Sequence, residues 1–401
     1  MEYVQERVAT LHEYDEVNPS VPVESTTVVV PMTERDHARP AAKRVLSTLE
    51  RVGPQRVVVA LRASQTAVRN VVSWLQEFDL PTTVLWCTAP QVESLLAESG
   101  LSGSTGKGRD VWLALGIASE SEYVVVHDVD TLTYDDTHVR RLLFPLTRGY
   151  EFSKGYYARV ENERLYGRLF RLFFTPLVRT LIEELSDGPE VNNSPKSGAT
   201  PGASNAQQAG TNSGRELLAY LDSFRYALAG EIGMTGEFAR TVRAPRGWGF
   251  EVGTLGEAFR LAGFENSAQV DLGVHEHDHR PVTGPGGLGG MAYEVAETLF
   301  TLLEESGTDL DYETLPERYR LSATTLVEQY ALDAAFNGFE YDREDEREQV
   351  AVYARSIQPP ESNDCLPAWC DTSLSPEAVL DRSSRAIERL QTTPVDREGR
   401  L

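Results

Sequence analysis

The sequence predicts an α/β protein built on a doubly wound sheet, because four short apolar runs rich in β-branched residues alternate with four helical patterns. The runs read as buried parallel strands and span residues 27–31, 56–61, 82–86 and 123–127. Helical spacing fills the intervals at 39–52, 66–78, 91–99 and 109–118. Such sheets bind ligands beyond the carboxyl ends of their strands, so the residues that follow each run are the candidates for a site.

The rest of the chain predicts a second half of the same domain, followed by a helical extension. Helical patterns cover 165–185, 215–228, 291–305 and 309–356, and a strand pattern covers 269–275. Residues 186–214 have hardly an apolar side chain, which predicts a disordered surface insertion. We therefore expect an N-terminal extension (1–25), one domain (26–305) with halves at 26–135 and 136–305, and a helical extension (306–401) that is loosely structured beyond residue 358.

Acidic residues dominate the charge of the chain. Its 401 residues include 61 Asp and Glu against 38 Lys and Arg, a formal charge of -23. This balance argues against a nucleic-acid partner, because phosphate recognition needs a basic surface. Only four of the 38 cations are lysines. An acidic, lysine-poor surface is typical of a protein kept soluble in concentrated salt, and an ordinary acidic enzyme is the alternative.

Cysteine usage and hydropathy indicate a cytoplasmic protein without stable membrane insertion. Cys87, Cys365 and Cys370 are too scattered for a disulfide framework, and no secretory segment precedes the first strand. Cys365 and Cys370 could pair or bind metal, but no second pair completes a zinc site. Charged residues interrupt the apolar segment 165–185, which favours a helix packed on the sheet over an interfacial amphipathic helix.

The sharpest local motif is Asp128-Val129-Asp130, directly after the fourth strand pattern. Two carboxylates at such a strand end can hold a hard divalent cation, Mg²⁺ or Mn²⁺, whose remaining ligands are usually substrate phosphates. The motif therefore suggests a nucleotide diphosphate bound through metal, and an acidic strand exit without a ligand is the alternative.

Two of the rare lysines also lie in glycine-containing motifs. Gly106-Lys107-Gly108 precedes a helical pattern, where glycines let the backbone approach a ligand and the lysine adds a charge for a phosphate. The motif is not a Walker A sequence. Lys154, in residues 152–157, is the second candidate for a ligand contact.

Three of the seven histidines, His275, His277 and His279, follow the strand pattern at 269–275. Strand alternation would put them on one face, from which one imidazole could complete the metal shell begun by Asp130. Solvated histidines at a polar strand exit are the alternative.

In combination, these motifs resemble the glucosyl-3-phosphoglycerate synthase family of retaining glycosyltransferases over about residues 25–305. The resemblance rests on Gly106-Lys107-Gly108, Asp128-Val129-Asp130, 152–157 (FSKGYY), Gly230-Glu231, 247–253 (GWGFEVG) and 269–277 (QVDLGVHEH). It implies a GT-A fold, a Rossmann-like, doubly wound mixed sheet, with a helical C-terminal extension.

The resemblance also implies roles for individual residues. Asp130 and His277 would bind the divalent metal, Mg²⁺ or Mn²⁺, and Glu231 and Glu251 would be the catalytic carboxylates. The donor-binding residues would be Pro31, Glu34, Ser64, Lys107, Asp128 and Val129. The acceptor-binding residues would be Gly167, Arg168, Trp248 and His275. Trp248 replaces a family tyrosine, Phe170 a threonine and His275 an arginine.

The implied activity is metal-dependent transfer of a hexose, with glucose favoured over mannose, from a nucleotide diphosphate sugar to 3-phosphoglycerate or a related small anionic acceptor. We expect the protein to form a homodimer. A local basic pocket would have to attract this acceptor against the negative field of the chain. We expect it to consist of Arg168, Arg243, Arg246 and Arg280. A polyprenyl phosphate acceptor at a membrane and a non-catalytic nucleotide-sugar-binding protein are the alternatives.

Overall fold

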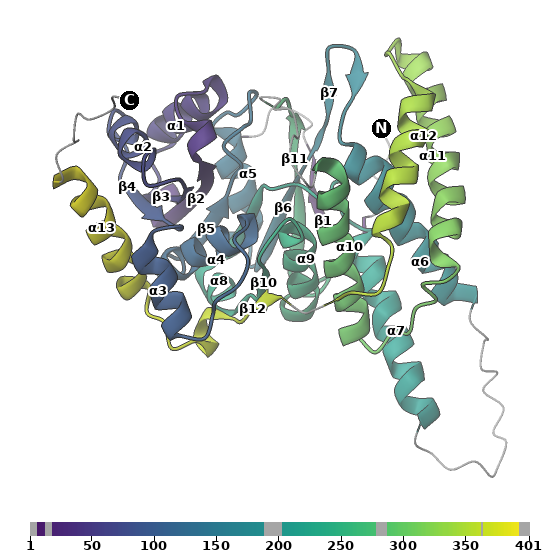
Figure 1. Cartoon of the computed structure of the whole chain (residues 1–401). Helices are drawn as coiled ribbons and strands as arrows, with labels where there is room; N and C mark the ends of the chain where they lie inside the picture. Colours follow the sequence, from purple (N-terminus) through teal and green to yellow (C-terminus); the bar gives the residue numbers. More distant parts are fainter. Residues whose placement is uncertain (1–5, 13–17, 188–202, 278–286, 362–363, 393–401) are drawn as a thin grey trace, which may run out of the picture.

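The computed structural model describes residues 6–12, 18–187, 203–277, 287–361 and 364–392 and confirms the α/β prediction. Within them, eight strands form one sheet in the order β1-β11-β6-β9-β5-β2-β3-β4 (Figure 1). The strands are β1 (Ala9–Leu11), β2 (Thr26–Thr33), β3 (Arg56–Arg62), β4 (Thr82–Trp86), β5 (Tyr123–Val126), β6 (Phe152–Ala158), β9 (Ile232–Thr235) and β11 (Ser267–Val274).

Strands β5, β2, β3 and β4 are parallel, as the repeated strand–helix pattern predicts. The helices that connect them are α1 (Pro40–Val52), α2 (Val68–Leu75), α3 (Pro90–Glu98) and α4 (Lys107–Ala118). Helix α1 shows why the boundaries were predictable: it begins with a proline and ends before Gly53, which adopts the left-handed conformation. Its buried residues Val45, Leu49 and Val52 recur at helical spacing.

The second half of the domain makes the sheet mixed. Strand β9 is antiparallel to both of its neighbours, β5 and β6, whereas β11 is parallel to β6. Strand β1 pairs with β11 in parallel, so the expected N-terminal extension contributes one edge of the sheet. The connecting elements are α5 (Thr137–Leu146), the hairpin β7 (Val160–Glu161) and β8 (Arg164–Leu165), α8 (Gly236–Thr241), β10 (Ala244–Pro245) and α9 (Phe250–Leu261).

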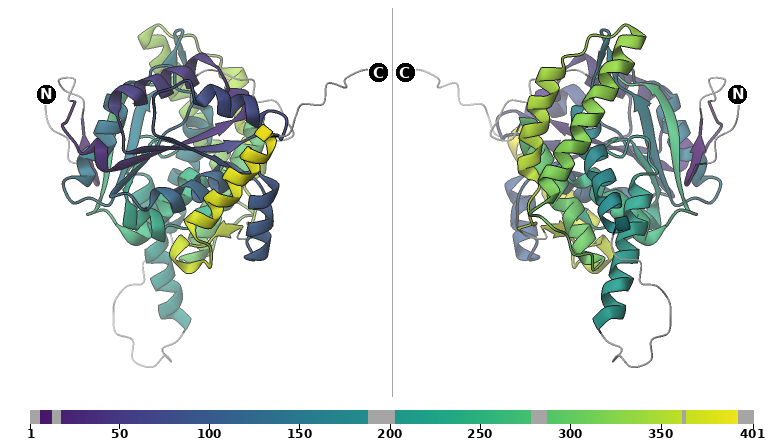
Figure 2. Two further views of the ribbon diagram at one scale, coloured as in Figure 1. Left: turned by 90° about the vertical axis from the view of Figure 1, so that its left-hand side faces the viewer. Right: turned by 90° about the vertical axis from the view of Figure 1, so that its right-hand side faces the viewer.

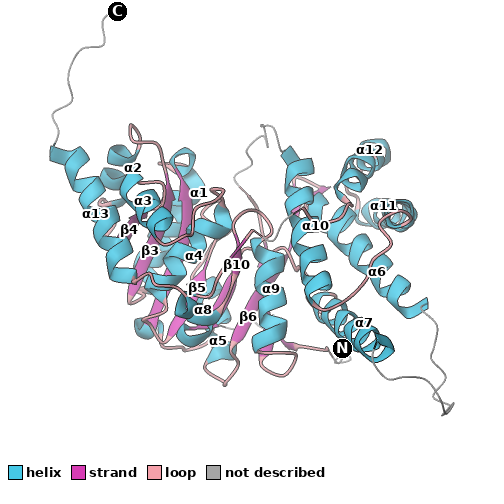
Figure 3. Ribbon diagram, turned by 60° about the horizontal axis from the view of Figure 1, so that its bottom comes forward, coloured by secondary structure: helices cyan, strands magenta, loops and turns pink. Residues whose placement is uncertain are grey.

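Further helices gather at one end of the sheet, at the right of Figure 1 and again in Figure 3. They are the π-helix η3 (Leu169–Phe174), α6 (Thr175–Asp187), α7 (Ala203–Leu221), α10 (Gly287–Glu305), α11 (Leu315–Asn337) and α12 (Arg343–Tyr353). Segment 165–185 thus lies largely in η3 and α6. No helix among the described residues is long and apolar enough to cross a membrane.

The prediction of a disordered insertion at 186–214 is wrong for the part that belongs to helices. Helix α6 continues to Asp187 and α7 begins at Ala203, while residues 188–202 lie outside the described residues. Buried leucines later in α7, Leu217, Leu218 and Leu221, anchor this helix by packing. Once a turn exists, extension through alanine and small polar residues costs little, so a helix forms where composition alone predicted none.

The C-terminal segment is ordered, which corrects the expectation of a loose tail for residues 364–392. Strand β12 (Cys365–Leu366) pairs with β10, and Trp369 stacks on Trp112 of α4 at 4.6 Å between ring centroids. Helix α13 (Pro376–Thr392) runs along β4 and α3 (Figure 2). Its Ser383 hydroxyl accepts a 2.8 Å hydrogen bond from the Trp86 amide. The tail therefore covers the β4 edge of the sheet.

Candidate active site

Lys107 joins two of the predicted site residues. Its ammonium lies 2.6 Å from Asp128 Oδ1 and donates a 2.7 Å hydrogen bond to Glu251 Oε1. The three residues come from the start of α4, the loop after β5 and the start of α9. Burial opposes the charge on Lys107, but the two carboxylates outweigh burial and raise the pKa of the ammonium. Lys107 therefore remains a cation and fixes both acids.

The glycines beside Lys107 allow a close packing contact, and their expected role in ligand approach stays a prediction. A Cβ on Gly108 would lie 1.9 Å from the Pro245 carbonyl oxygen, and one on Gly106 would lie 2.3 Å from that of Arg246. The Arg109 amide donates a 2.8 Å hydrogen bond to the same Arg246 carbonyl. The glycines thus let the start of α4 pack directly on the segment that follows β10, which places Lys107 opposite Glu251.

Asp130 and His277, the predicted metal ligands, do come together. His277 Nδ1 lies 3.7 Å from Asp130 Oδ2, and an isolated β-bridge joins Thr131 to His277. Asp130 Oδ1 is buried without a hydrogen-bond partner in the described part of the chain. Burial and the charge of Asp128 raise the pKa of Asp130 to about 6.

These properties fit a divalent cation. A carboxylate and an imidazole are suitable donors, and a cation would satisfy the buried oxygen and oppose the repulsion from Asp128. Among the described residues no group of three potential His, Cys, Asp or Glu ligands is found, so the other ligands would come from substrate or water. His279 lies outside the described residues.

Glu231 and Lys154 are two further buried ionisable residues near this site. Burial, followed by the charge of Asp128, raises the pKa of Glu231 to about 8. Burial lowers the pKa of Lys154 to about 8, and its ammonium donates a 2.6 Å hydrogen bond to the Ala229 carbonyl. Burial therefore favours the protonated form of Glu231, whereas Glu251 forms an ion pair with Lys107.

The residues predicted for the uridine site lie at the carboxyl ends of β2 and β3. Pro31 lies within β2, and Glu34 follows it. The Ser64 amide donates a 2.6 Å hydrogen bond to Glu34 Oε2, and bonds from Ser64 lower the pKa of Glu34. Val129 is buried between the two aspartates of the loop after β5. All four positions lie at or near the carboxyl ends of β2, β3 and β5, where sheets of this kind bind ligands.

The predicted acceptor residues are less well assembled. Arg168 pairs with Asp345 and, at 3.0 Å, with Glu346 of α12, so carboxylates already neutralise it. His275 is fully buried and stacks on Tyr157 at 3.9 Å, which suits support of His277 better than contact with an acceptor. Trp248 is 45% exposed. Gly167 has a φ of 77°, a left-handed conformation that favours glycine.

The basic pocket expected from four arginines is not formed by free cations. Arg243 pairs with Glu257 and Glu305, and Arg246 pairs with Asp364. Arg280 lies outside the described residues. The sequence does not reveal which carboxylates fold against these arginines, and the basic acceptor pocket stays a prediction.

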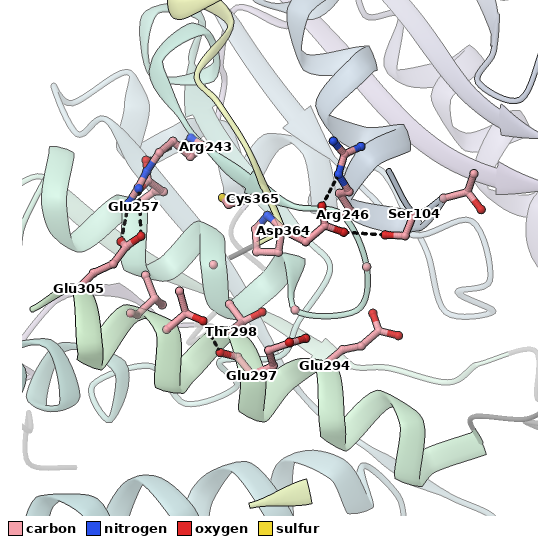
Figure 4. A pocket seen from close by; sticks show the side chains of 17 residues that line it. Ser104, Arg243, Arg246, Glu257, Glu294, Glu297, Thr298, Glu305, Asp364 and Cys365 are labelled. Atoms are coloured by element: carbon pink, nitrogen blue, oxygen red, sulfur yellow. Dashed lines mark hydrogen bonds and ion pairs between the residues drawn. The ribbon is translucent and has the colours of Figure 1, made fainter. Parts of the chain in front are cut away.

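A cavity of about 200 Å³ lies beside Arg243 and Arg246 (Figure 4). Five carboxylate residues line it, against these two arginines. The carboxylates are Glu257, Glu294, Glu297, Glu305 and Asp364. Such a lining disfavours a phosphorylated acid, and of the residues predicted for the acceptor pocket only Arg243 and Arg246 contribute to it among the described residues.

Arg159 is not among the residues predicted from the sequence, although its charge acts on Asp130. It follows β6, two positions after Tyr157, and lies against Gly167. Strand alternation from Tyr157 was the available signal, but it could not show that the chain returns to this point through the β7–β8 hairpin.

Comparisons with known proteins agree with this geometry. No family model matches the chain. It is 31% identical over 385 residues to the glucosyl-3-phosphoglycerate synthase of Methanococcoides burtonii, covering 89% of this chain and 88% of that one. It is also 31% identical over 387 residues to the enzyme of the same name from Persephonella marina, covering 90% and 89%.

A solved structure shares the fold at lower identity. The glucosyl-3-phosphoglycerate synthase from Mycobacterium tuberculosis in complex with phosphoglyceric acid has a TM-score of 0.51 and 19% identity, covering 76% of this chain and 89% of that one. The fold is thus the GT-A fold. Because the chain covers most of relatives that are more than 30% identical to it, it belongs to the glucosyl-3-phosphoglycerate synthase family of glycosyltransferases.

Proposed function

We propose that this chain transfers glucose from UDP-glucose to 3-phosphoglycerate with retention of configuration, using Mg²⁺ or Mn²⁺. The observation that carries the proposal is the joint arrangement of Lys107, Asp128 and Glu251 beside the Asp130–His277 pair, at the carboxyl edge of the sheet. Family membership supports the donor and the acceptor.

The donor would bind across the ends of β2, β3 and β5. Pro31, Glu34 and Ser64 would line the uridine, and the Glu34–Ser64 hydrogen bond would keep that wall in place. Lys107 orients Asp128, which would accept hydrogen bonds from the ribose hydroxyls. Val129 would contribute backbone contacts between the two aspartates.

Asp130 and His277 would hold the metal ion. When bound, this ion supplies positive charge that stabilises the departing nucleotide diphosphate. Deprotonated Asp130 and neutral His277 are the forms required for binding.

Glu251 and Glu231 would act on the sugar in different ways. Glu251, fixed by Lys107, presents a carboxylate that can stabilise positive charge developing at the anomeric carbon. Glu231, protonated near neutral pH, can donate a hydrogen bond to a sugar oxygen. A departing phosphate oxygen would take the proton of the acceptor hydroxyl on the same face, so no protein base is required.

A donor-by-acceptor panel tests this proposal. The purified chain in 2 M KCl with MnCl₂ is supplied with UDP-glucose or GDP-mannose, and with 3-phosphoglycerate, D-glycerate or a polyprenyl phosphate. We expect transfer from UDP-glucose to 3-phosphoglycerate, abolished in Asp130→Ala and retained in Asp381→Ala, a control on the surface of α13. Preferential transfer to the polyprenyl phosphate, or UDP binding without turnover on any acceptor, would contradict the proposal.

We also expect a cytoplasmic homodimer, and both expectations remain predictions. Cell fractionation in native salt tests the compartment, and light scattering of the purified chain tests the assembly.

A further inference from the structure

His127 and Glu231 lie opposite each other at the carboxyl edge of the sheet. The pairing of the antiparallel strands β5 and β9 ends one row before them. One row after them the two chains are still in contact, because a Cβ on Gly230 would lie 2.2 Å from Asp128 Oδ2. The row between contains His127 and Glu231. Side chains of opposite residues in antiparallel strands share a face, with Cβ atoms about 5 Å apart.

This row faces helix α5 and not Lys107. Gly233, two residues along β9 from Glu231, lies on the same face, and a Cβ there would lie 2.8 Å from the Leu142 carbonyl oxygen of α5. Successive residues of a strand alternate between faces, so Asp128, which pairs with Lys107, lies on the opposite face from His127. The orientation of Glu231 therefore depends on side chains of the α5 face.

The α5 face carries a layer of buried polar side chains whose hydrogen bonds are unmade. His127 is fully buried, and Glu231 and Tyr134 are each 1% exposed. Among the described residues, both ring nitrogens of His127, both carboxyl oxygens of Glu231 and the Tyr134 hydroxyl lack an aligned partner, although the Tyr157 hydroxyl approaches Glu231. Buried groups of this kind are few in folded proteins, and each one calls for an explanation.

Aromatic contacts hold His127 in this layer. Its ring meets Tyr134 edge to face with 5.0 Å between centroids, and Tyr134 packs on His138 at 4.7 Å. His138 Nδ1 lies 3.1 Å from Asp135 Oδ1, beside the start of α5. Burial lowers the pKa of His127 well below its ordinary value. The imidazole is therefore neutral, with one nitrogen that donates a hydrogen bond and one that accepts.

We propose that His127 is a positioning residue for glucosyl transfer: its N–H donates a hydrogen bond to one carboxyl oxygen of Glu231 and aims the other, protonated oxygen at the bound sugar. This inference rests on the proposed function and deepens it. The second ring nitrogen of His127 can accept a hydrogen bond from the Tyr134 hydroxyl, which gives a chain of neutral groups that ends at the sugar. Side-chain rotation closes the chain when the donor binds, since hydrogen bonds of reacting groups often tighten only in the complex.

A double-mutant cycle tests whether His127 acts through Glu231. His127→Phe keeps a ring beside Tyr134 and removes both nitrogens. We expect kcat for transfer to fall about 10- to 100-fold, the size of effect that a misplaced reacting group produces. KM for 3-phosphoglycerate and the affinity for UDP should stay unchanged. In a Glu231→Ala background the same substitution should change kcat by less than about 2-fold, because the group that His127 positions is absent. Equal losses in the two backgrounds would overturn the inference.

Conservative variants and a matched control accompany the cycle. His127→Asn and His127→Gln keep an N–H donor, and at least one of them should recover part of the lost kcat. His138→Phe removes an imidazole of the same layer that is already bound by Asp135 and does not lie opposite Glu231. It should leave kcat within about 2-fold of the wild type. A loss of kcat as large as that of His127→Phe, at equal melting temperature, would contradict the role of His127.

Infrared spectroscopy separates this inference from the proposed function. In the chain with UDP-glucose and MnCl₂ but no acceptor, the carbonyl stretch of protonated Glu231 is the band that Glu231→Gln removes. His127→Phe should move this band to higher frequency, because the carbonyl loses a hydrogen bond. A wild-type chain that shows this shift but does not transfer glucose to 3-phosphoglycerate contradicts the proposed function alone. A band that is absent from the wild type, or unmoved in His127→Phe, contradicts the role of His127 even where transfer occurs.

Discussion

Lys107 shows how one residue can organise a site in an acidic protein. Without its ammonium, Asp128 and Glu251 would be two carboxylates in a poorly solvated pocket with no counter-charge between them. The rarity of lysine in this chain made Lys107 a candidate for a ligand contact, which stays a prediction, and the structure places it between two of the predicted site residues. The sequence alone could not reveal that Lys107 pairs with Glu251, which is 144 residues away in the chain.

Replacing Lys107 by Met should therefore damage both stability and donor binding. We expect a loss of about 3 kcal/mol in the free energy of unfolding, typical of removing one partner from a buried ion pair. UDP affinity in the presence of MnCl₂ should fall at least about 10-fold. Thermal unfolding and calorimetry measure the two effects, and Lys43→Met, on the exposed face of α1, is the control. Equal losses of unfolding free energy and of UDP affinity in the two variants would show that Lys107 does not hold Asp128 and Glu251 in place.

Glu231 should make the stability of the protein depend on pH. Its pKa is about 8 in the folded chain, above the ordinary value of 4.5, so the folded state holds a proton that the unfolded state has released between these pH values. The stability contributed by this proton is complete below pH 4.5 and is lost as pH rises to 8. Glu231→Gln keeps a neutral group at all pH values and removes this loss.

The difference in unfolding free energy between Glu231→Gln and the wild type should thus grow in favour of the variant from pH 4.5 to 8. Each pKa unit corresponds to about 1.4 kcal/mol, so the gain should reach a few kcal/mol. Thermal unfolding in 2 M KCl with EDTA, at intervals of one pH unit, measures it. A difference that stays constant across this window would mean that Glu231 is ionised in the folded chain.

At the scale of elements, the periodicity of apolar residues predicted most strands and helices. It could not predict contacts between residues that are far apart in the sequence. Strands 82–86 and 123–127 agree with β4 and β5 almost to the residue, because buried β-branched runs have few other solutions. The packing of the C-terminal segment on α4 depends on the contact between Trp112 and Trp369, which are 257 residues apart in the sequence. No local pattern encodes such a contact. The same holds for the carboxylates of α12 that pair with Arg168 and Arg171.

Helix α12 should hold η3 in place through Glu346. This buried carboxylate pairs with Arg168 and Arg171 at 3.0 and 3.2 Å. Its removal would leave the buried Arg171 guanidinium without a carboxylate partner among the described residues, whereas Arg168 would keep Asp345. Glu346→Ala should lower the free energy of unfolding by about 3–5 kcal/mol. Chemical denaturation measures the change, with the neighbouring exposed Glu348→Ala as control. A loss equal to that of the control would contradict this role.

The whole molecule carries a formal charge of -23, and much of its cation content is already engaged in ion pairs. Self-repulsion of the remaining carboxylates opposes the folded state at low ionic strength. Screening shortens the range of this repulsion from about 10 Å at 0.1 M salt to about 3 Å at 1 M.

The melting temperature should therefore rise as KCl increases from 0.1 to 2 M, with most of the gain below about 1 M, where the screening length changes most. Differential scanning calorimetry measures it. A flat or falling melting temperature would show that charge repulsion does not limit the stability of this fold.

Strand β1 forms one edge of the sheet and helix α13 covers the other, and this has a consequence for biosynthesis. Strand β1 can pair only after β11 has been synthesised, more than 250 residues later, and the β4 edge is covered only after α13 has been synthesised. As the polypeptide leaves the ribosome, the first half can pair β5, β2, β3 and β4, but Trp112 and the β4 edge stay uncovered until residues 369 and 383 emerge. A nascent chain stalled before residue 365 therefore leaves the β4 edge uncovered, and this exposed strand edge, a type of site at which chains can pair and aggregate, is removed when residues 365–392 fold onto it.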